Sequence, residues 1–194
     1  MSELTIIPKS QVTGIILAGG KSTRFGSDKA LFEYKGKKLV EYSIETIKTL
    51  SDTILLSTNS PEKFDFTGLK TVTDIYPGSG PVAGIHACLQ QSKTEHNLII
   101  GCDLPWLDPR LFRLLLEKNP GFQVVIPSHN GHYETMASYY HKSCAGHLEQ
   151  ALQNKQYKVL DAIASLKTLY AEIQNEEFYS ERLFSNINYL RDIR

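Results

Sequence analysis

The sequence predicts a three-layer α/β fold built on a mostly parallel, doubly wound sheet. Three observations support this fold class. Short apolar segments alternate with amphipathic helical segments as far as about residue 126, glycines directly follow the first apolar segment, and carboxylates such as Asp103 come just after later ones. Buried parallel strands are short apolar runs of this kind, and the helices that connect them cover both faces of the sheet.

Strands are expected where a short apolar run rich in β-branched residues is closed by turn residues. The run from Val12 to Leu17, closed by Gly19, should be a buried parallel strand. The segment near 135–140 lies outside the regular alternation and predicts a small antiparallel excursion. The expected strands are 12–17, 53–57, 70–73, 98–101, 122–126, 135–140 and 167–171.

Helices are expected where apolar residues recur every three or four positions. Val40, Ile44 and Ile47 have this spacing within 37–50. Pro81 suits the first turn of a second helix, and Asp108 before a proline predicts the N-cap of a leucine-rich helix ending near residue 118. A further helix is expected near 143–153.

The composition limits the class of partner. The 194 residues favour one domain spanning 1–194, and 21 basic residues balance 21 acidic ones. Without a net positive field, the chain is not expected to bind nucleic acid, so any bound anion must be met by local groups.

Membrane insertion and secretion are also disfavoured. The longest uncharged stretch, 75–92, is broken by glycines and prolines, and residues 1–5 lack the pattern of a signal peptide. The three cysteines have no CxxC spacing, which disfavours a disulfide framework. A cytoplasmic location is expected.

Ligands of doubly wound sheets bind outside the carboxyl ends of the strands. The loops after Leu17, Ser57, Thr73 and Gly101 should therefore meet at one crevice. In the first of these loops, Gly19 and Gly20 let backbone amides approach a nucleotide closely, while Arg24 and Lys29 supply positive charge for phosphates. The alternative is a tight turn with solvated basic side chains.

Two familiar nucleotide motifs are excluded by spacing. A P-loop needs a glycine where Ile15 stands, and the glycines at 78, 80 and 84 miss the dinucleotide pattern by one position. Asp103, beyond the expected strand 98–101, is a hard ligand suited to Mg²⁺ together with phosphate oxygens. A turn or helix cap is its alternative role.

Four segments together resemble the molybdenum cofactor guanylyltransferases. They are LAGGxxxRxGxxK at 17–29, Asp74 followed by GPVAG at 80–84, CDLP at 102–105, and FSNIN at 184–188. They occur in the order found in that family. The resemblance implies a Rossmann-like nucleotidyltransferase that uses GTP and Mg²⁺ to attach GMP to the terminal phosphate of molybdopterin, releasing pyrophosphate.

The resemblance also implies roles for particular residues. Arg24, Lys29 and Asp103 would be catalytic, with Asp103 holding the metal. Asn186 and Asn188 would serve the pterin or the metal, and in a strand they would point the same way. The nucleotide-binding residues would be Leu17, Ala18, Gly19, Gly20, Lys29, Asp74 and Asp103.

Several alternatives remain open. The family often has an asparagine that contacts the nucleotide at the end of the second strand, where we place Ser57, and Asn59 is a candidate substitute. A CTP-dependent molybdopterin cytidylyltransferase, a sugar-phosphate nucleotidyltransferase and a non-catalytic nucleotide-binding regulator are rival functions. Transient contact with other proteins of molybdenum cofactor biosynthesis, or with acceptor proteins, is compatible with the resemblance.

The histidines offer a weaker alternative. His129 and His132 have a spacing seen in metal sites, but Asn130 and Gly131 between them are typical of a turn. A polar loop is therefore preferred over zinc.

Overall fold

The computed structural model describes residues 7–19 and 28–187. These residues form ten strands and five α-helices, with short 3-10 turns between some of them. The strands are β1 (Val12–Leu17), β2 (Glu33–Tyr34), β3 (Lys37–Lys38), β4 (Thr53–Ser57), β5 (Lys70–Val72), β6 (His96–Gly101), β7 (Val124–His129), β8 (His132–Tyr133), β9 (Ala137–His141) and β10 (Thr168–Glu172). The helices are α1 (Leu39–Lys48), α2 (Gly80–Gln91), α3 (Pro109–Lys118), α4 (Ala145–Gln153) and α5 (Val159–Ala162).

The central sheet of the described residues has eight strands, seven of them in the order β10-β7-β9-β6-β1-β4-β5, with β8 paired to β7. Strands β6, β1, β4 and β5 pair in parallel, as do β7 and β10. Strand β9 is antiparallel to both β6 and β7. The predicted fold class is confirmed, including the antiparallel excursion, which is β9.

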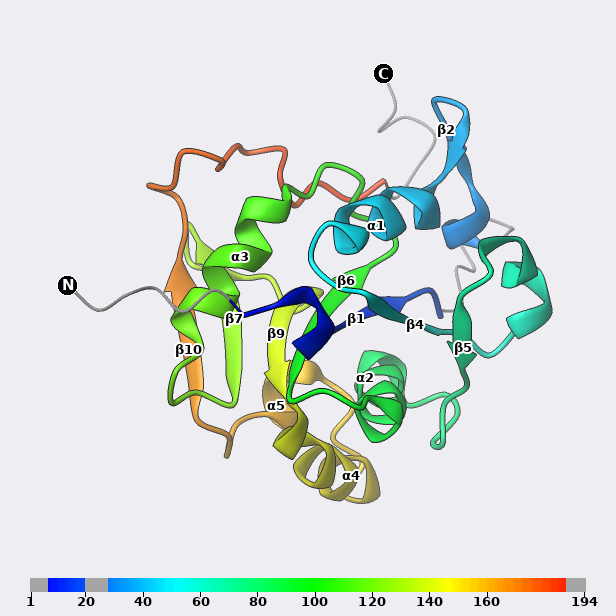
Figure 1. The fold of residues 1–194 in the computed structure, drawn as a ribbon. Helices are drawn as coiled ribbons and strands as arrows, with labels where there is room; N and C mark the ends of the chain where they lie inside the picture. The colour runs from blue at the N-terminus through cyan, green and yellow to red at the C-terminus, as the bar shows by residue number, and fades with distance from the viewer. Residues whose placement is uncertain (1–6, 20–27, 188–194) are drawn as a thin grey trace.

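Helices cover both faces of this sheet (Figure 1). Helices α1 and α3 lie on one face, where Ile16 and Leu98 belong to the hydrophobic core. Helices α2, α4 and α5 lie on the other, where Ile15 and Ile99 belong to a second core. Successive strand side chains point to opposite faces, so one continuous apolar run serves both cores.

The helix expected over 37–50 begins two residues later, at Leu39. Lys37 and Lys38 instead pair with β2 in a two-stranded hairpin. Its turn is made by Lys35 and Gly36, whose φ angles are 49° and 78°, as a tight hairpin turn requires. The periodicity did not reveal this hairpin because each of its strands has only two residues.

The start of α3 agrees with the prediction. The Asp108 carboxylate accepts a hydrogen bond from the backbone N–H of Arg110 at 2.8 Å and acts as the N-cap. The Arg110 side chain, bonded to the same carboxylate, lowers the pKa of Asp108 below its ordinary value. Asp108 is therefore a structural acid.

Most remaining differences from the predictions are shifts of element ends. Strand β7 begins two residues after the predicted start and extends to His129, and β9 and β10 are shifted toward the C-terminus in the same way. Strand β8 and helix α5 were not predicted, because two and four residues are too short to show a periodicity.

The packing of α1 against β1 depends on Gly14. A Cβ atom at this position would overlap the Cγ2 atom of Ile47, which is fully buried. We expect Gly14→Ala to lower the free energy of unfolding by about 1–3 kcal/mol, because a close-packed contact would be forced apart. Chemical denaturation measures the loss.

Gly146 provides the matched control. It lies in α4, and apart from its chain neighbours and the backbone of its own helix, no described atom approaches within 4 Å of the position its Cβ would occupy. Gly146→Ala should be neutral or should stabilise the protein by up to about 1 kcal/mol. Equal stabilities of the two variants would contradict this account of the α1–β1 contact.

Candidate functional site

Four parallel strands end at one level, and this level defines the site. Leu17 of β1 is in register with Ser57 of β4 and with Gly101 of β6. Ser57 is in register with Val72 of β5. The loops that follow these strands therefore begin side by side, as predicted for this edge of the sheet.

Four residues that could contact a ligand lie two positions beyond the ends of these strands. They are Gly19 after β1, Asn59 after β4, Asp74 after β5 and Asp103 after β6. Backbone hydrogen bonds continue past the strand ends, from Ala18 N–H to the Ser57 carbonyl at 2.9 Å and from Cys102 N–H to the Leu17 carbonyl at 3.2 Å. These bonds hold the starts of the loops together.

Lys29 and Asp103 form an ion pair at this edge. The Lys29 Nζ atom donates to Asp103 Oδ2 at 2.7 Å, and 14% and 28% of the two side chains are exposed. The residues are 74 positions apart in the chain. The structure thus brings together the lysine and the acid that the sequence analysis had singled out separately.

Packing and a cap hold Lys29 in place. It begins a 3-10 turn, Lys29–Leu31, whose Ala30 is buried in the core. The Asp28 carboxylate accepts a hydrogen bond from Ala30 N–H at 3.3 Å and caps this turn. The backbone under the lysine is therefore anchored, while its side chain reaches the edge of the sheet.

Asn59 and Asp74 form a second polar pair. Asn59 Nδ2 donates to Asp74 Oδ2 at 2.7 Å, and the Asp74 backbone N–H donates to Asn59 Oδ1 at 3.0 Å. Both atoms of the amide group are engaged, so the loop after β4 orients the carboxylate after β5.

The two residues considered at the second strand differ in exposure. Ser57 is buried, with 3% of its surface exposed, whereas Asn59 is exposed beside Asp74. The Asn59 side chain is therefore the more accessible of the two at this edge.

Helix α2 begins at the same edge. Gly78, before the helix, and Gly80, its first residue, have φ angles of 79° and 67°, which favour glycine, and Pro81 lies in the first turn as predicted. A Cβ atom on Gly84 would lie 2.5 Å from Ser57 Oγ, so only glycine allows the helix this close to β4. The amino end of such a helix favours negative charge.

The closing segment, defined as residues 173–187, reaches the site from the C-terminal side. Ile187 is buried against Tyr34 and Leu39, and its backbone N–H donates to the Asp103 carbonyl at 3.4 Å. Asn186 is exposed beside this anchor. Residues 185–187 form no strand, so the strand considered for this segment is wrong over its described part. The segment is instead anchored by the buried Ile187 side chain and by the hydrogen bond from its backbone N–H.

Some predicted site residues lie outside the described part of the chain. They are Gly20, Arg24 and Asn188. Leu17 and Ala18 are buried at the end of β1, and Gly19 is exposed just beyond them. The described site thus joins β1, Lys29, the Asn59–Asp74 pair, Asp103 and Asn186.

The three cysteines are poorly suited to nucleophilic catalysis. Burial raises the pKa of Cys88 and of Cys144 to about 12. Burial, with the nearby Asp103 charge, raises the pKa of Cys102 well above its ordinary range. All three are therefore thiols at neutral pH, and nucleophilic attack requires a thiolate.

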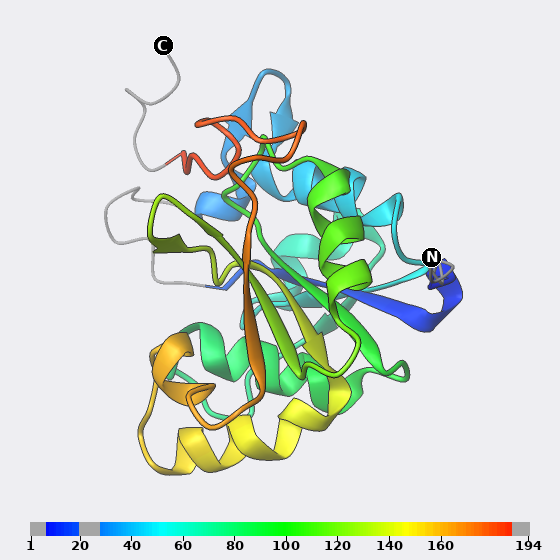
Figure 2. The same cartoon turned by 90° about the vertical axis from the view of Figure 1, so that its left-hand side faces the viewer.

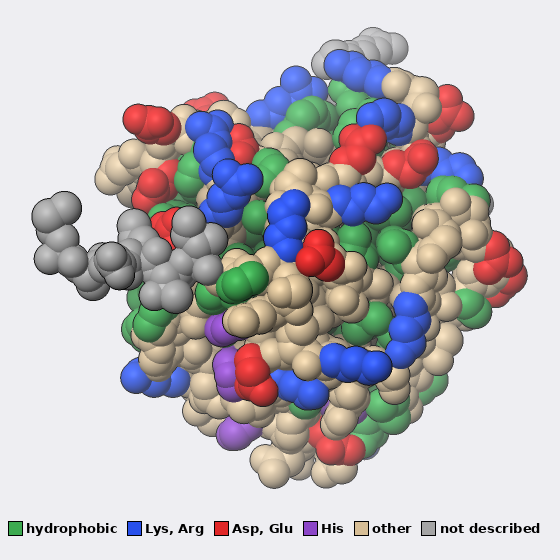
Figure 3. Space-filling view, viewed as in Figure 1, with side chains coloured by type: hydrophobic (Ala, Val, Ile, Leu, Met, Phe, Trp, Pro, Cys, Tyr) green, Lys and Arg blue, Asp and Glu red, His purple; other side chains and the backbone are tan. Residues whose placement is uncertain are grey.

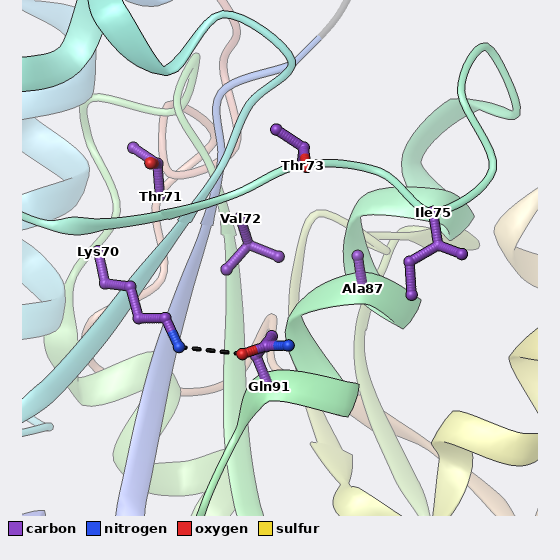
Figure 4. A pocket seen from close by; sticks show the side chains of 7 residues that line it. All are labelled: Lys70, Thr71, Val72, Thr73, Ile75, Ala87 and Gln91. Carbon is purple, nitrogen blue, oxygen red and sulfur yellow. Dashed lines mark hydrogen bonds between the residues drawn. The ribbon is translucent and has the colours of Figure 1, made fainter.

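A separate groove lies outside this site, between edge strand β5 and helix α2 (Figure 4). Its volume is about 360 Å³, and Lys70 Nζ, its one cation, donates to Gln91 Oε1 at 3.0 Å. The groove contains no carboxylate. It is lined by Lys70, Thr71, Val72, Thr73, Ile75, Ala87 and Gln91.

The surface outside the site has mixed charge. Figure 3 shows basic and acidic side chains interspersed over one face, as the zero net charge leads one to expect. Among residues 7–19 and 28–187, no helix has the length and apolar character needed to cross a membrane. The same residues contain no group of three or more histidine, cysteine or acidic side chains arranged to hold a metal ion.

Fold and site together define a class of protein. A cation, a carboxylate, a close-approach glycine and a helix amino end over the carboxyl edge of a doubly wound sheet are typical of an α/β protein that handles nucleotide phosphates.

Comparison with known proteins makes this class specific. Residues 14–169 match the model of the MobA-like NTP transferase domain. The chain is 32% identical over 192 residues to a probable molybdenum cofactor guanylyltransferase of Natranaerobius thermophilus, covering 94% of this chain and 93% of the relative. It is 31% identical over 185 residues to a protein of the same description from Pelotomaculum thermopropionicum, covering 94% and 90%.

A solved structure gives the same result for the fold. The crystal structure of molybdopterin-guanine dinucleotide biosynthesis protein A from Archaeoglobus fulgidus has a TM-score of 0.79 and 24% identity, covering 93% of this chain and 94% of that one. The chain belongs to the MobA-like NTP transferase family and is a nucleotidyltransferase.

Proposed function

We propose that this nucleotidyltransferase transfers GMP from GTP to the terminal phosphate of molybdopterin, releasing pyrophosphate. The Lys29–Asp103 ion pair at the common end of four parallel strands is the observation that carries the proposal. Guanylyltransferases among the relatives support GTP as donor and molybdopterin as acceptor.

The nucleotide would bind on the β1–β4–β5 side of Asp103. The backbone around Leu17, Ala18 and Gly19 would contact the nucleotide, because Gly19 has no side chain to keep it away. The carboxylate of Asp74 accepts hydrogen bonds, so it suits ribose hydroxyls or guanine N–H groups. Asn59 holds this carboxylate at 2.7 Å and would fix its orientation toward the nucleoside.

The donor set also fits Mg²⁺. This ion is commonly held by one or two carboxylates with substrate phosphates and water, rather than by a cage of protein ligands. Asp103, partly exposed at the strand end, is such a carboxylate. When bound, the ion would neutralise phosphate charge on the nucleotide and on the departing pyrophosphate.

The chain's own groups would act by position and charge. The acceptor is itself a phosphate monoester, whose second pKa is about 6, so its dianion can attack the α-phosphorus without a protein nucleophile. The Lys29 ammonium, paired with Asp103 before substrate binds, would turn to the phosphates and stabilise the charge that grows in the transition state. We also propose that Arg24 contributes to this charge and that Asn186 and Asn188 serve the pterin side.

The ion pair provides the first test. Asp103→Ala and Lys29→Ala should each lower the turnover number for GMP transfer at least about tenfold, because one transition-state contact is commonly worth more than about 1.4 kcal/mol. Pyrophosphate release with GTP, Mg²⁺ and molybdopterin measures the rate.

Lys48→Ala is the matched control, because Lys48 is exposed in the last turn of α1. This variant should transfer GMP as the unaltered protein does. If Asp103→Ala and Lys29→Ala also kept near-normal rates, the assignment of the reaction to this edge would be wrong.

The Asn59–Asp74 pair tests the nucleotide side. Asn59→Ala removes the hydrogen bond to the Asp74 carboxylate and the acceptor of the Asp74 backbone N–H, so the dissociation constant for Mg·GTP should rise about three- to tenfold. Isothermal titration calorimetry measures the constant. Asn175→Ala, in an exposed turn after β10, should not change it, and an unchanged constant in Asn59→Ala would place the nucleoside elsewhere.

A further inference from the structure

His129, at the carboxyl end of β7, is the centre of a polar cluster that the proposed reaction does not yet use. Its Nε2 atom lies 2.9 Å from Glu134 Oε1, and its Nδ1 atom lies 3.2 Å from the Tyr179 hydroxyl. Its ring stacks on Phe184, with ring centroids 5.0 Å apart and planes 15° from parallel. Only 15% of the side chain is exposed.

The hydrogen bonds of this cluster have a consistent direction. Asn130 Nδ2 is 3.3 Å from the Tyr179 hydroxyl and donates to it. If the Tyr179 hydroxyl donates to His129 Nδ1, and His129 Nε2–H donates to Glu134, each of these three contacts has one donor and one acceptor. Both ring nitrogens are then engaged within the protein, which leaves neither free to bind a metal ion.

The cluster joins two segments that are distant in the sequence. His129, Asn130 and Glu134 belong to the β7–β8 hairpin and the residues after it, whereas Tyr179 and Phe184 belong to the closing segment. A further bond runs from Asn130 N–H to Gln174 Oε1 at 2.9 Å. The hairpin therefore holds the closing segment along much of its length.

The closing segment ends at the reaction site. Two residues after Phe184 comes exposed Asn186, and the next residue donates to the Asp103 carbonyl. Figure 2 shows the hairpin and this segment at the same side of the molecule as the end of β1. The position of His129 is thus linked to Asp103 by a short series of contacts.

Sheet order separates this unit from the residues assigned to the nucleotide. The residues assigned to the nucleotide follow β1, β4 and β5, on one side of Asp103, whereas β9 and β7 lie on the other. In-line displacement at the α-phosphorus puts the attacking oxygen opposite the leaving pyrophosphate, with the nucleoside beside that line, so the acceptor needs surface of its own next to Asp103. The hairpin lies across β6 from the residues assigned to the nucleotide, and the closing segment joins this hairpin to Asp103.

We propose that His129 is a positioning residue for the acceptor: by clamping the closing segment to the β7–β8 hairpin, it holds Asn186 and the acceptor-side wall in place beside Asp103. This inference rests on the proposed function. It assigns no proton transfer to His129, because both of its nitrogens contact protein groups.

The test separates acceptor binding from nucleotide binding. His129→Phe keeps an aromatic ring against Phe184 but removes both polar contacts, and Tyr179→Phe removes one hydroxyl. In steady-state assays the KM for molybdopterin should rise about tenfold in His129→Phe and about threefold in Tyr179→Phe. The KM for GTP should stay within about twofold of the unaltered value in both variants.

Hydrogen exchange supplies a readout that does not depend on activity. Amides of residues 173–187 should exchange faster in His129→Phe, while those of β1 and β4 should keep their protection. His132→Phe is the matched control, because His132 is exposed on β8 of the same hairpin and phenylalanine keeps a ring beside His129, whose centroid is 5.9 Å away. It should leave both KM values and the exchange of the closing segment unchanged.

The outcomes distinguish the two proposals. An unchanged KM for molybdopterin in His129→Phe, or an equal rise for both substrates, would overturn the positioning role. If His129→Phe does not fold, Tyr179→Phe decides by the same criteria. Failure of the unaltered protein to transfer GMP would instead overturn the proposed function.

Discussion

The structure of the site depends on the common register of four parallel strands. Because Leu17, Ser57, Val72 and Gly101 lie at one level, each strand delivers its next residues to the same edge. Two residues are enough to leave the hydrogen-bonded ladder and expose a functional group. Shifting any one strand by a single residue would move its functional group away from the others and reverse the faces of its side chains.

At this edge of the sheet, the described carboxylates Asp103 and Asp74 each have a hydrogen-bond partner within the protein. Lys29 compensates Asp103, and Asn59 holds Asp74. Partly buried charges without partners are costly, and a loop carrying such a charge would tend to move it into water. The two pairs therefore hold these loops together at the ends of the strands.

Much of this arrangement could be predicted from the sequence, because the signals were local. The apolar run of β1, the Asp108 cap and the glycines at the start of α2 each specify the local structure in which they occur. The pairing of Lys29 with Asp103, and that of Asn59 with Asp74, arises only when distant strands align, so local patterns could not reveal either. The His129 cluster was predicted as a polar loop for the same reason: Tyr179 and Phe184 lie about 50 residues further along the chain.

Guanylyl transfer requires that the protein uses GTP and that molybdopterin accepts the GMP. The most direct measurement is pyrophosphate release by the purified protein with Mg²⁺ and molybdopterin, in parallel reactions with GTP, CTP, ATP and UTP. We expect release with GTP that depends on molybdopterin, and little with the other three. Equal use of all four nucleotides, preference for CTP, or no release with any of them would contradict guanylyl transfer.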